Sequence, residues 1–129
     1  MIAQRVVLDT DIVIDLLKKT PATVTRFVAL AAAQTTFLVN PVVVAEVYAS
    51  AFELEHKDIE AFFNLCQRIN TDSDTGRTAG LYAHRYSKAF SGISLEDFLM
   101  AATAKNQRCP LWTRNRKHYP MDDIELLAA

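Results

Sequence analysis

Three acidic side chains stand out because of where the sequence places them. Asp9 follows the apolar run Val6–Leu8 and precedes apolar residues at helical spacing, so it marks a strand-to-helix junction, where open α/β sheets bind ligands. Glu46 projects from a helix face of small and apolar residues, which predicts a buried carboxylate that needs a partner from elsewhere in the fold. Asp97 lies three residues after Ser94, at the spacing of a helix capping box.

These acids share a chemistry that the other residues do not offer. Carboxylates are hard oxygen ligands, which suit Mg²⁺ or Mn²⁺. A catalytic zinc site is disfavoured because the histidines are scattered, and neither a glycine-rich phosphate loop nor a serine-nucleophile motif occurs. Ala101 and Ala104 share the helix face of Asp97, and such small side chains let that face approach the sheet. For Glu46, an ion pair with a distant arginine or a backbone cap stays an open alternative.

Further polar residues extend this candidate site. Thr10 is predicted to hydrogen-bond a carboxylate ligand or a bound water, and Asp11 would act likewise behind the ligands, although a helix N-cap is the role that its position favours. A predicted strand is followed by four residues that would contact phosphates: Arg114, Arg116, Lys117 and His118. Arg108 would add to this basic patch. A solvated, charged loop is the ordinary alternative.

Length and composition bound the class of protein. The 129 residues are 50% hydrophobic with a net charge of −1, which predicts one domain, 1–129, without overall attraction to nucleic acid. No stretch approaches the ~20 apolar residues of a membrane span, and no export signal is visible. Cys66 and Cys109 lie far apart and are expected to be reduced thiols. We therefore expect a cytoplasmic protein that does not enter a membrane.

Strand-like and helix-like segments alternate along the chain. We expect strands at 6–8, 35–39, 109–113 and 124–127, and helices at 12–17, 20–34, 42–55, 56–69, 71–90 and 94–107. A strand between 68 and 72 is left open, and 114–120 is expected to be a loop or a single turn. The alternation predicts the α/β class, as a three-layer α/β/α sandwich with a central parallel sheet.

Four segments, in this order and at these intervals, resemble the PIN domain: "VVLDTDIVIDLL", "NPVVVAEVYASA", "ISLEDFLMAATA" and "LWTRNRKHYP". The sequence is similar in particular to VapC-type toxin ribonucleases of toxin–antitoxin pairs. The resemblance implies a Mg²⁺- or Mn²⁺-dependent endoribonuclease, with Asp9, Glu46 and Asp97 as the catalytic and metal-binding acids. Asn115 stands where many members carry a fourth Asp, which makes it a weak ligand, and His118 where several carry another.

The resemblance also implies partners. These are an RNA substrate, an antitoxin protein and a second copy of the chain in a homodimer. Phe52, Phe62 and Phe63 lie on consecutive predicted helices and would line a groove for a partner helix, although ordinary core packing is the favoured role for any one of them.

Two alternatives stay open. The loss of acids at Asn115 and His118 would suit a degenerate PIN-like module that binds RNA or protein without cutting. The opening segment is also similar to that of haloacid-dehalogenase-type phosphatases, in which Asp9 would be the nucleophile and Asp11 the general acid. That second alternative leaves Glu46 unexplained.

Overall fold

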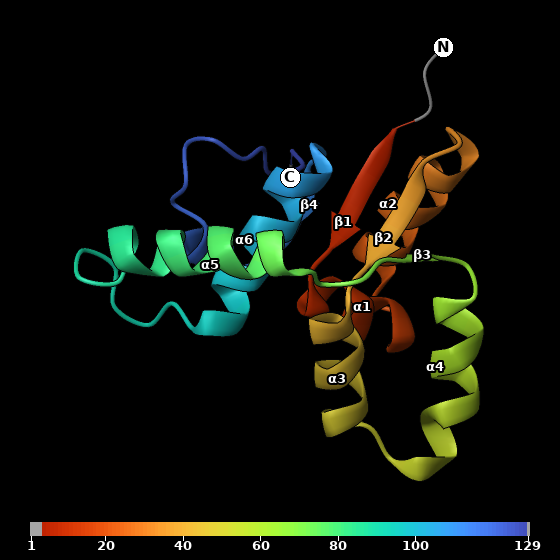
Figure 1. Cartoon of the computed structure of the whole chain (residues 1–129). Coiled ribbons are helices and arrows are strands. Elements are labelled where there is room, and N and C mark those ends of the chain that lie inside the picture. Colours follow the sequence, from red (N-terminus) through yellow and green to blue (C-terminus); the bar gives the residue numbers. More distant parts are fainter. Residues whose placement is uncertain (1–3, 129) are drawn as a thin grey trace.

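A parallel sheet of four strands lies at the centre of the computed structural model, which describes residues 4–128 (Figure 1). The strands are β1 (Arg5–Leu8), β2 (Thr36–Val39), β3 (Gln67–Arg68) and β4 (Leu111–Trp112), in the spatial order β3-β2-β1-β4. Val6 is in register with Phe37 of β2, and Leu8 with Trp112 of β4. The winding of the chain reverses between β1 and β4, so a crevice is expected at the carboxyl ends of these two strands.

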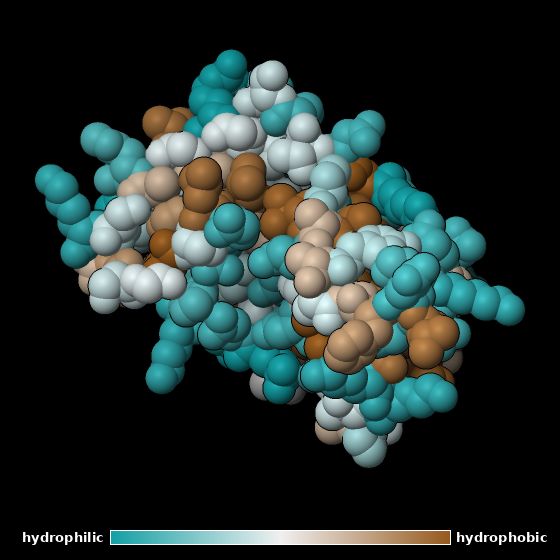
Figure 2. Space-filling view, turned by 90° about the horizontal axis from the view of Figure 1, so that it is seen from below, coloured by the Kyte–Doolittle hydropathy of each residue, from teal (hydrophilic) through white to brown (hydrophobic). Residues whose placement is uncertain are grey.

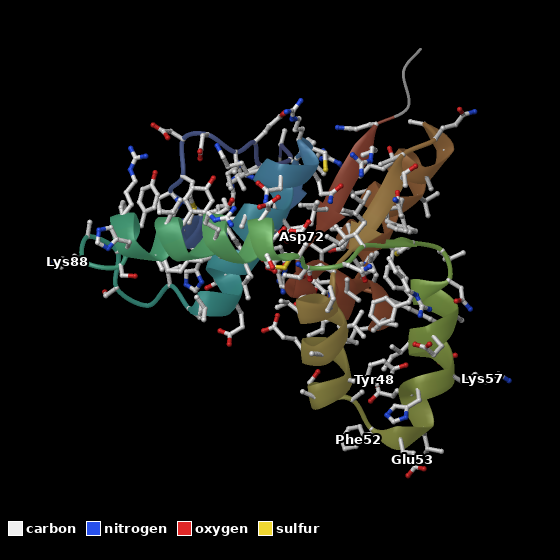
Figure 3. All side chains as sticks on the ribbon, viewed as in Figure 1. Tyr48, Phe52, Glu53, Lys57, Asp72 and Lys88 are labelled. Carbon is white, nitrogen blue, oxygen red and sulfur yellow. The ribbon has the colours of Figure 1, made fainter. Side chains whose placement is uncertain are left out.

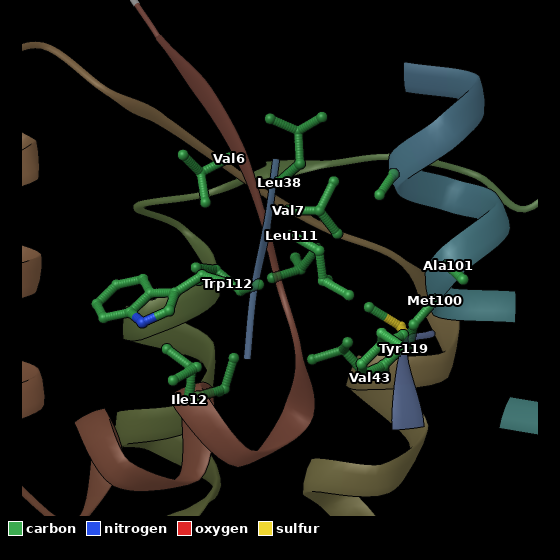
Figure 4. Close-up of a cluster of buried hydrophobic side chains, with 14 of the residues drawn as sticks. Val6, Val7, Ile12, Leu38, Val43, Met100, Ala101, Leu111, Trp112 and Tyr119 are labelled. Atoms are coloured by element: carbon green, nitrogen blue, oxygen red, sulfur yellow. The ribbon is translucent and has the colours of Figure 1, made fainter. Parts of the chain in front are cut away.

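Helices cover both faces of the sheet. They are α1 (Thr10–Leu17), α2 (Pro21–Ala32), α3 (Pro41–Ser50), α4 (His56–Phe63), α5 (Ser73–Tyr86) and α6 (Leu95–Gln107), with short 3-10 turns η1 (Glu53–Glu55) and η2 (Arg116–His118). Figure 4 shows the side chains of Ile12 and Trp112 on one side of the sheet and those of Met100 and Ala101 on the other. The predicted three-layer α/β/α sandwich is confirmed.

The core follows from the apolar runs in the sequence. Val6, Val7 and Leu8 are fully buried, as expected for a central strand covered on both faces. Ala101 and Ala104 of α6 are buried too, so this helix packs closely, as its small side chains predict. The stretch 114–120, expected to be a loop or a single turn, contains the short turn η2.

Several predicted segments differ from the structure. The helix expected over 42–55 ends at Ser50, because Ala51 adopts an extended backbone before the turn η1 begins. The helix expected over 56–69 ends at Phe63 and is followed by β3, whose pairing with β2 is a long-range contact that local propensity does not reveal. The strand expected over 124–127 is reduced to one parallel bridge between Leu111 and Leu126.

The predicted groove of three phenylalanines is also wrong. Phe63 is fully buried in the core, and Phe62 packs against Phe27 with ring centroids 5.9 Å apart. Only Phe52 is open to solvent, with 78% of its surface exposed, at the turn between α3 and α4 (Figure 3). The early end of α3 explains this, because it moves Phe52 off the helix face on which the prediction placed it.

Two further expectations concern membranes and thiols. Within residues 4–128, the structure contains no helix that is both long and apolar enough to cross a membrane. Cys66 and Cys109 are free, as predicted. Burial raises the pKa of the Cys66 thiol to about 12 and also raises that of Cys109. Both thiols therefore stay protonated at neutral pH and are poor nucleophiles and metal ligands.

Candidate active site

Asp9 lies between the carboxyl ends of β1 and β4. Its backbone N–H donates to the carbonyl oxygen of Trp112 at 3.0 Å, which fixes Asp9 beside the end of β4. Its carboxylate Oδ1 accepts from the backbone N–H of Thr10 at 2.8 Å, so Asp9 caps α1. The N-cap role predicted for Asp11 is therefore wrong. Asp9 is only 7% exposed, and it combines helix capping with a place at the sheet edge.

Two buried hydroxyl groups orient the other oxygen of Asp9. Thr113 donates to Asp9 Oδ2 at 2.8 Å, and Tyr119 donates to the same atom at 2.9 Å. Burial, reinforced by the nearby carboxylates, raises the pKa of Tyr119, so its hydroxyl remains a proton donor. Neither residue was singled out from the sequence, because a lone Thr or Tyr in a loop has no spacing that marks it. Both lie in the segment "LWTRNRKHYP".

Asp97 lies next to Asp9 across the Tyr119 hydroxyl. The predicted capping box is confirmed: Asp97 N–H donates to Ser94 Oγ, and Ser94 N–H donates to Asp97 Oδ2, each at 3.2 Å. The same carboxylate lies 3.5 Å from the Tyr119 hydroxyl through Oδ1 and 2.8 Å from Nδ1 of His118 through Oδ2. Tyr119 therefore bridges two of the three predicted acids.

Glu46 reaches the site from α3. Its Oε1 accepts from the hydroxyl of Thr10 at 2.6 Å, so the predicted contact between Thr10 and a carboxylate is present. The expectation of a buried Glu46 is wrong, because α3 turns Val43 and Val47 into the core and leaves Glu46 exposed beside them. In residues 4–128 Glu46 forms no ion pair, so a hydroxyl takes the place of the expected arginine.

Asn40 fixes the helix that carries Glu46. This fully buried side chain accepts from the backbone N–H of Val43 at 3.0 Å and donates to the Thr103 hydroxyl of α6 at 3.0 Å. It thereby joins the helices of Glu46 and Asp97. Asn40 was not singled out from the sequence. An N-cap residue followed by proline at the first helical position is the signal that would have found this role.

Asp11 lies behind the three acids. Its Oδ2 accepts from the backbone N–H of Arg114 at 3.0 Å, which ties the loop after β4 to α1. Its Oδ1 is buried and has no hydrogen-bond partner in the described part of the chain. Burial, and then the charge of Asp9, raise the pKa of the Asp11 carboxyl. The site thus contains an unsatisfied acidic oxygen in addition to the three predicted ligands.

The basic loop is more tightly held than its sequence indicates. The Arg114 guanidinium pairs with buried Asp15 at 3.0 Å, and Arg116 donates to the carbonyl oxygen of Leu127 at 2.9 Å. Lys117 is exposed, and the side chain of Asn115 lies 3.0 Å from Nδ1 of His118.

Arg108 does not belong to this patch. It ends α6 and precedes β4, whereas the site lies beyond the carboxyl end of β4. That prediction is wrong, because nearness in sequence across a strand places residues at opposite edges of the sheet.

The donor set fits a hard divalent cation in type and charge, although it is not gathered into a ligand cluster. In the part of the chain that the structure describes, no three His, Cys, Asp or Glu side chains come together as a metal site. The Tyr119 hydroxyl stands between Asp9 and Asp97 instead, and the Thr10 hydroxyl donates to Glu46. The donors are oxygens, and Asp11 adds an unsatisfied one, which is the ligand chemistry that Mg²⁺ and Mn²⁺ prefer.

Fold and site together define an α/β protein with an acidic site at the carboxyl ends of its parallel strands. Residues 6–124 match the model of the PIN domain family, and the chain belongs to this family. Ribonuclease VapC19 of Mycobacterium tuberculosis (strain CDC 1551 / Oshkosh) is 32% identical over 114 residues, which cover 88% of this chain and 91% of that protein. The predicted PIN resemblance is confirmed, and the family assignment removes the phosphatase alternative.

Solved structures share the fold over nearly the whole chain. VapBC2 from Rickettsia felis bound to a DNA fragment from its promoter superposes with a TM-score of 0.81 at 20% identity, covering 96% of this chain and 98% of that one. VapBC-1 from nontypeable Haemophilus influenzae gives a TM-score of 0.79 at 21% identity, with 96% and 97% covered. At these identities the likeness establishes the architecture alone.

Proposed function

We propose that this protein is a divalent-cation-dependent endoribonuclease and the toxin of a toxin–antitoxin pair, formed by one PIN-like nuclease domain over residues 1–129. The observation that carries the proposal is the set of acids at the carboxyl edge, in which Tyr119 joins Asp9 to Asp97 and Thr10 joins α1 to Glu46. The similarity to Ribonuclease VapC19 supplies the reaction and the substrate class.

Asp9, Glu46 and Asp97 would hold Mg²⁺ or Mn²⁺, with Asn115 as a weak additional ligand. Such an ion activates the attacking water and offsets charge on the phosphate oxygens. The chain's own groups orient the acids: Thr113 and Tyr119 hold Asp9, and Thr10 holds Glu46. Removal of a group that orients a metal ligand typically lowers metal affinity or activity by roughly 10–100-fold.

The loop after β4 would contact the RNA backbone. Lys117 is exposed, and Arg114 keeps 62% of its side chain open although its Nε pairs with Asp15. Arg116 and His118 complete the proposed contacts. These side chains would position the phosphates without reading the base sequence.

We also propose an antitoxin partner and a homodimer in the cytoplasm. The two solved structures compared above are VapBC proteins. A small hollow of about 260 Å³ is lined mostly by apolar residues of α1, α3 and α4, with exposed Phe52 at its rim. Figure 2 shows apolar patches interspersed with hydrophilic side chains on the face seen from below. The two free cysteines suit a reducing compartment.

The direct test is cleavage of a single-stranded oligoribonucleotide by purified protein with Mn²⁺, with Mg²⁺ or with a chelator. We expect cleavage that needs the metal and is lost in Glu46→Gln. Glu53→Gln is the matched control, because Glu53 is an exposed acid of the neighbouring turn η1 (Figure 3). Equal cleavage by both variants would point to a contaminating nuclease. RNA binding without cleavage would favour the degenerate binding module.

A further inference from the structure

A groove with an apolar floor lies beside the acidic site. It encloses about 610 Å³ between α2, the end of β4 and the C-terminal segment around Leu127. Ile12 and Trp112 form its floor, and Figure 4 shows them on the same side of the sheet. Its volume lies within the roughly 300–1,000 Å³ of typical ligand pockets.

The rim of the groove is cationic. Among its described lining residues are Arg26, Arg114 and Arg116, and none is acidic. Arg114 is neutralised by Asp15, but Arg116 donates to a backbone carbonyl and pairs with no carboxylate in the described part of the chain. An apolar floor with a cationic rim is complementary to a ligand that has a flat apolar part and a negative charge.

The groove and the acidic site share a wall. Thr113 lines the groove and also donates to Asp9 Oδ2 at 2.8 Å. Arg114 lines the groove with its side chain, and its backbone N–H donates to Asp11 at 3.0 Å. If a phosphate of a linear polymer lies at Asp9, the adjoining unit of that polymer therefore lies next to the groove.

We propose that this groove binds the base of the nucleotide next to the scissile phosphate, while Arg26 and Arg116 contact the adjoining phosphates. The proposal rests on the ribonuclease function proposed above. Bases of single-stranded RNA are flat and stack on aromatic side chains or guanidinium planes, and their phosphates supply the negative charge. An acidic peptide would match the rim but has no flat group for the floor.

The first test is binding of a fluorescent single-stranded oligoribonucleotide, followed by anisotropy in a Glu46→Gln background that does not cut it. We expect Arg26→Gln to weaken binding about 5- to 10-fold and to reduce the slope of log affinity against log salt by about 0.7, the value for one single-strand phosphate contact. Arg77→Gln is the control, because Arg77 is an exposed arginine of α5 that pairs with Asp74. It should leave both quantities unchanged.

The second test needs no change in the groove. An oligoribonucleotide with 4-thiouridine next to the cleaved bond should cross-link to peptides that contain residues 22–29 or 112–116. Cross-links confined to other segments, or undiminished binding by Arg26→Gln, would overturn the proposal that the groove binds a base. The proposed ribonuclease function would still hold in that case if the unaltered protein cleaves RNA. Displacement of the probe by poly-glutamate but not by unlabelled oligonucleotide would assign the groove to an acidic protein segment. Absence of both RNA binding and RNA cleavage in the unaltered protein would overturn both proposals.

Discussion

The two edges of the sheet arrange their charged residues in opposite ways. At the carboxyl edge, Asp9 and Asp97 share the hydroxyl of Tyr119, and within residues 4–128 neither pairs with a lysine or an arginine. At the amino edge, a larger hollow of about 860 Å³ is lined by charges of both signs. There Lys105 pairs with Asp123 at 2.6 Å and Arg77 with Asp74 at 2.7 Å.

This contrast indicates that the balance of charges identifies a ligand-binding site better than the volume of a hollow does. Exposed ion pairs like those of the amino edge are worth about 0–1 kcal/mol each and need no further ligand. Like charges held together by neutral hydroxyls repel each other, and that repulsion is relieved only when something positive binds. The carboxyl edge, whose acids are not balanced by lysine or arginine, is therefore the one expected to act on a substrate.

The change expected to have the largest effect is Asp9→Asn. It should lower RNA cleavage by more than about 100-fold, beyond the usual 10–100-fold effect of an outer-sphere group. The fold should persist, because the new amide oxygen still accepts from Thr10 and its nitrogen has hydroxyl oxygens of Thr113 and Tyr119 as acceptors. Initial cleavage rates and thermal melting measure the two effects.

Asp74→Asn at the amino edge is the control for this prediction. Asp74 is exposed, and within residues 4–128 its one ion pair is with the neighbouring Arg77 on α5. Its variant should cleave RNA at the rate of the unaltered protein. Equal losses of cleavage activity in both variants would show that the two edges do not differ in function. Full activity of Asp9→Asn would show that Asp9 is not a principal metal ligand.

A matched pair of tyrosines gives the second prediction. Tyr119 donates to Asp9 at 2.9 Å, and Tyr82 donates to Asp123 at 2.8 Å. Tyr119→Phe and Tyr82→Phe should each lower the free energy of unfolding by about 1–2 kcal/mol, since each leaves a carboxylate short of one donor. Only Tyr119→Phe should also lower kcat, by roughly 10–100-fold. A similar kcat in both variants would mean that Tyr119 serves stability alone.

The third prediction adds charge to the unbalanced edge. Asn115→Asp should tighten Mn²⁺ binding about 30-fold, because one more negative charge at about 4 Å from a divalent ion is worth about 2 kcal/mol in water-like surroundings. Asn106→Asp, in the hollow at the amino edge, should have no such effect. Titration calorimetry without RNA measures both. Two tight Mn²⁺ sites in the unaltered protein would show that Asn115 does not limit binding.

The smallest effect is expected at Asp72, the N-cap of α5 (Figure 3). The backbone N–H of Thr75, and then its hydroxyl, hold the pKa of Asp72 below its usual 3.8. A lowered folded-state pKa means that the ionised carboxylate stabilises the fold above the unfolded pKa and stops doing so as the pH falls through the folded value.

Asp72→Asn should therefore lower the melting temperature slightly at neutral pH. This difference should shrink as the pH falls from neutral through the folded-state pKa of Asp72, and RNA cleavage at neutral pH should not change. Melting curves across this pH range provide the measurement. A difference in melting temperature that grows on acidification would contradict the sign of the pKa shift.

Local features of the chain were predictable from the sequence. The buried run Val6–Leu8 identified the central strand, and its end at Asp9 located the first acid. The spacing of Ser94 and Asp97 predicted a capping box that the structure contains. Such features are readable because their hydrogen bonds and periodicities span only a few residues.

Contacts between distant segments required the tertiary structure. Asp9 and Tyr119 are 110 residues apart, and they meet because β1 and β4 are neighbours in the sheet. The same strand order places Arg108 at the opposite edge and gives Glu46 a hydroxyl of α1 as its partner. Periodicity assigns a residue to a helix or a strand, but the packing of strands and helices determines which side chains meet and whether a carboxylate is buried.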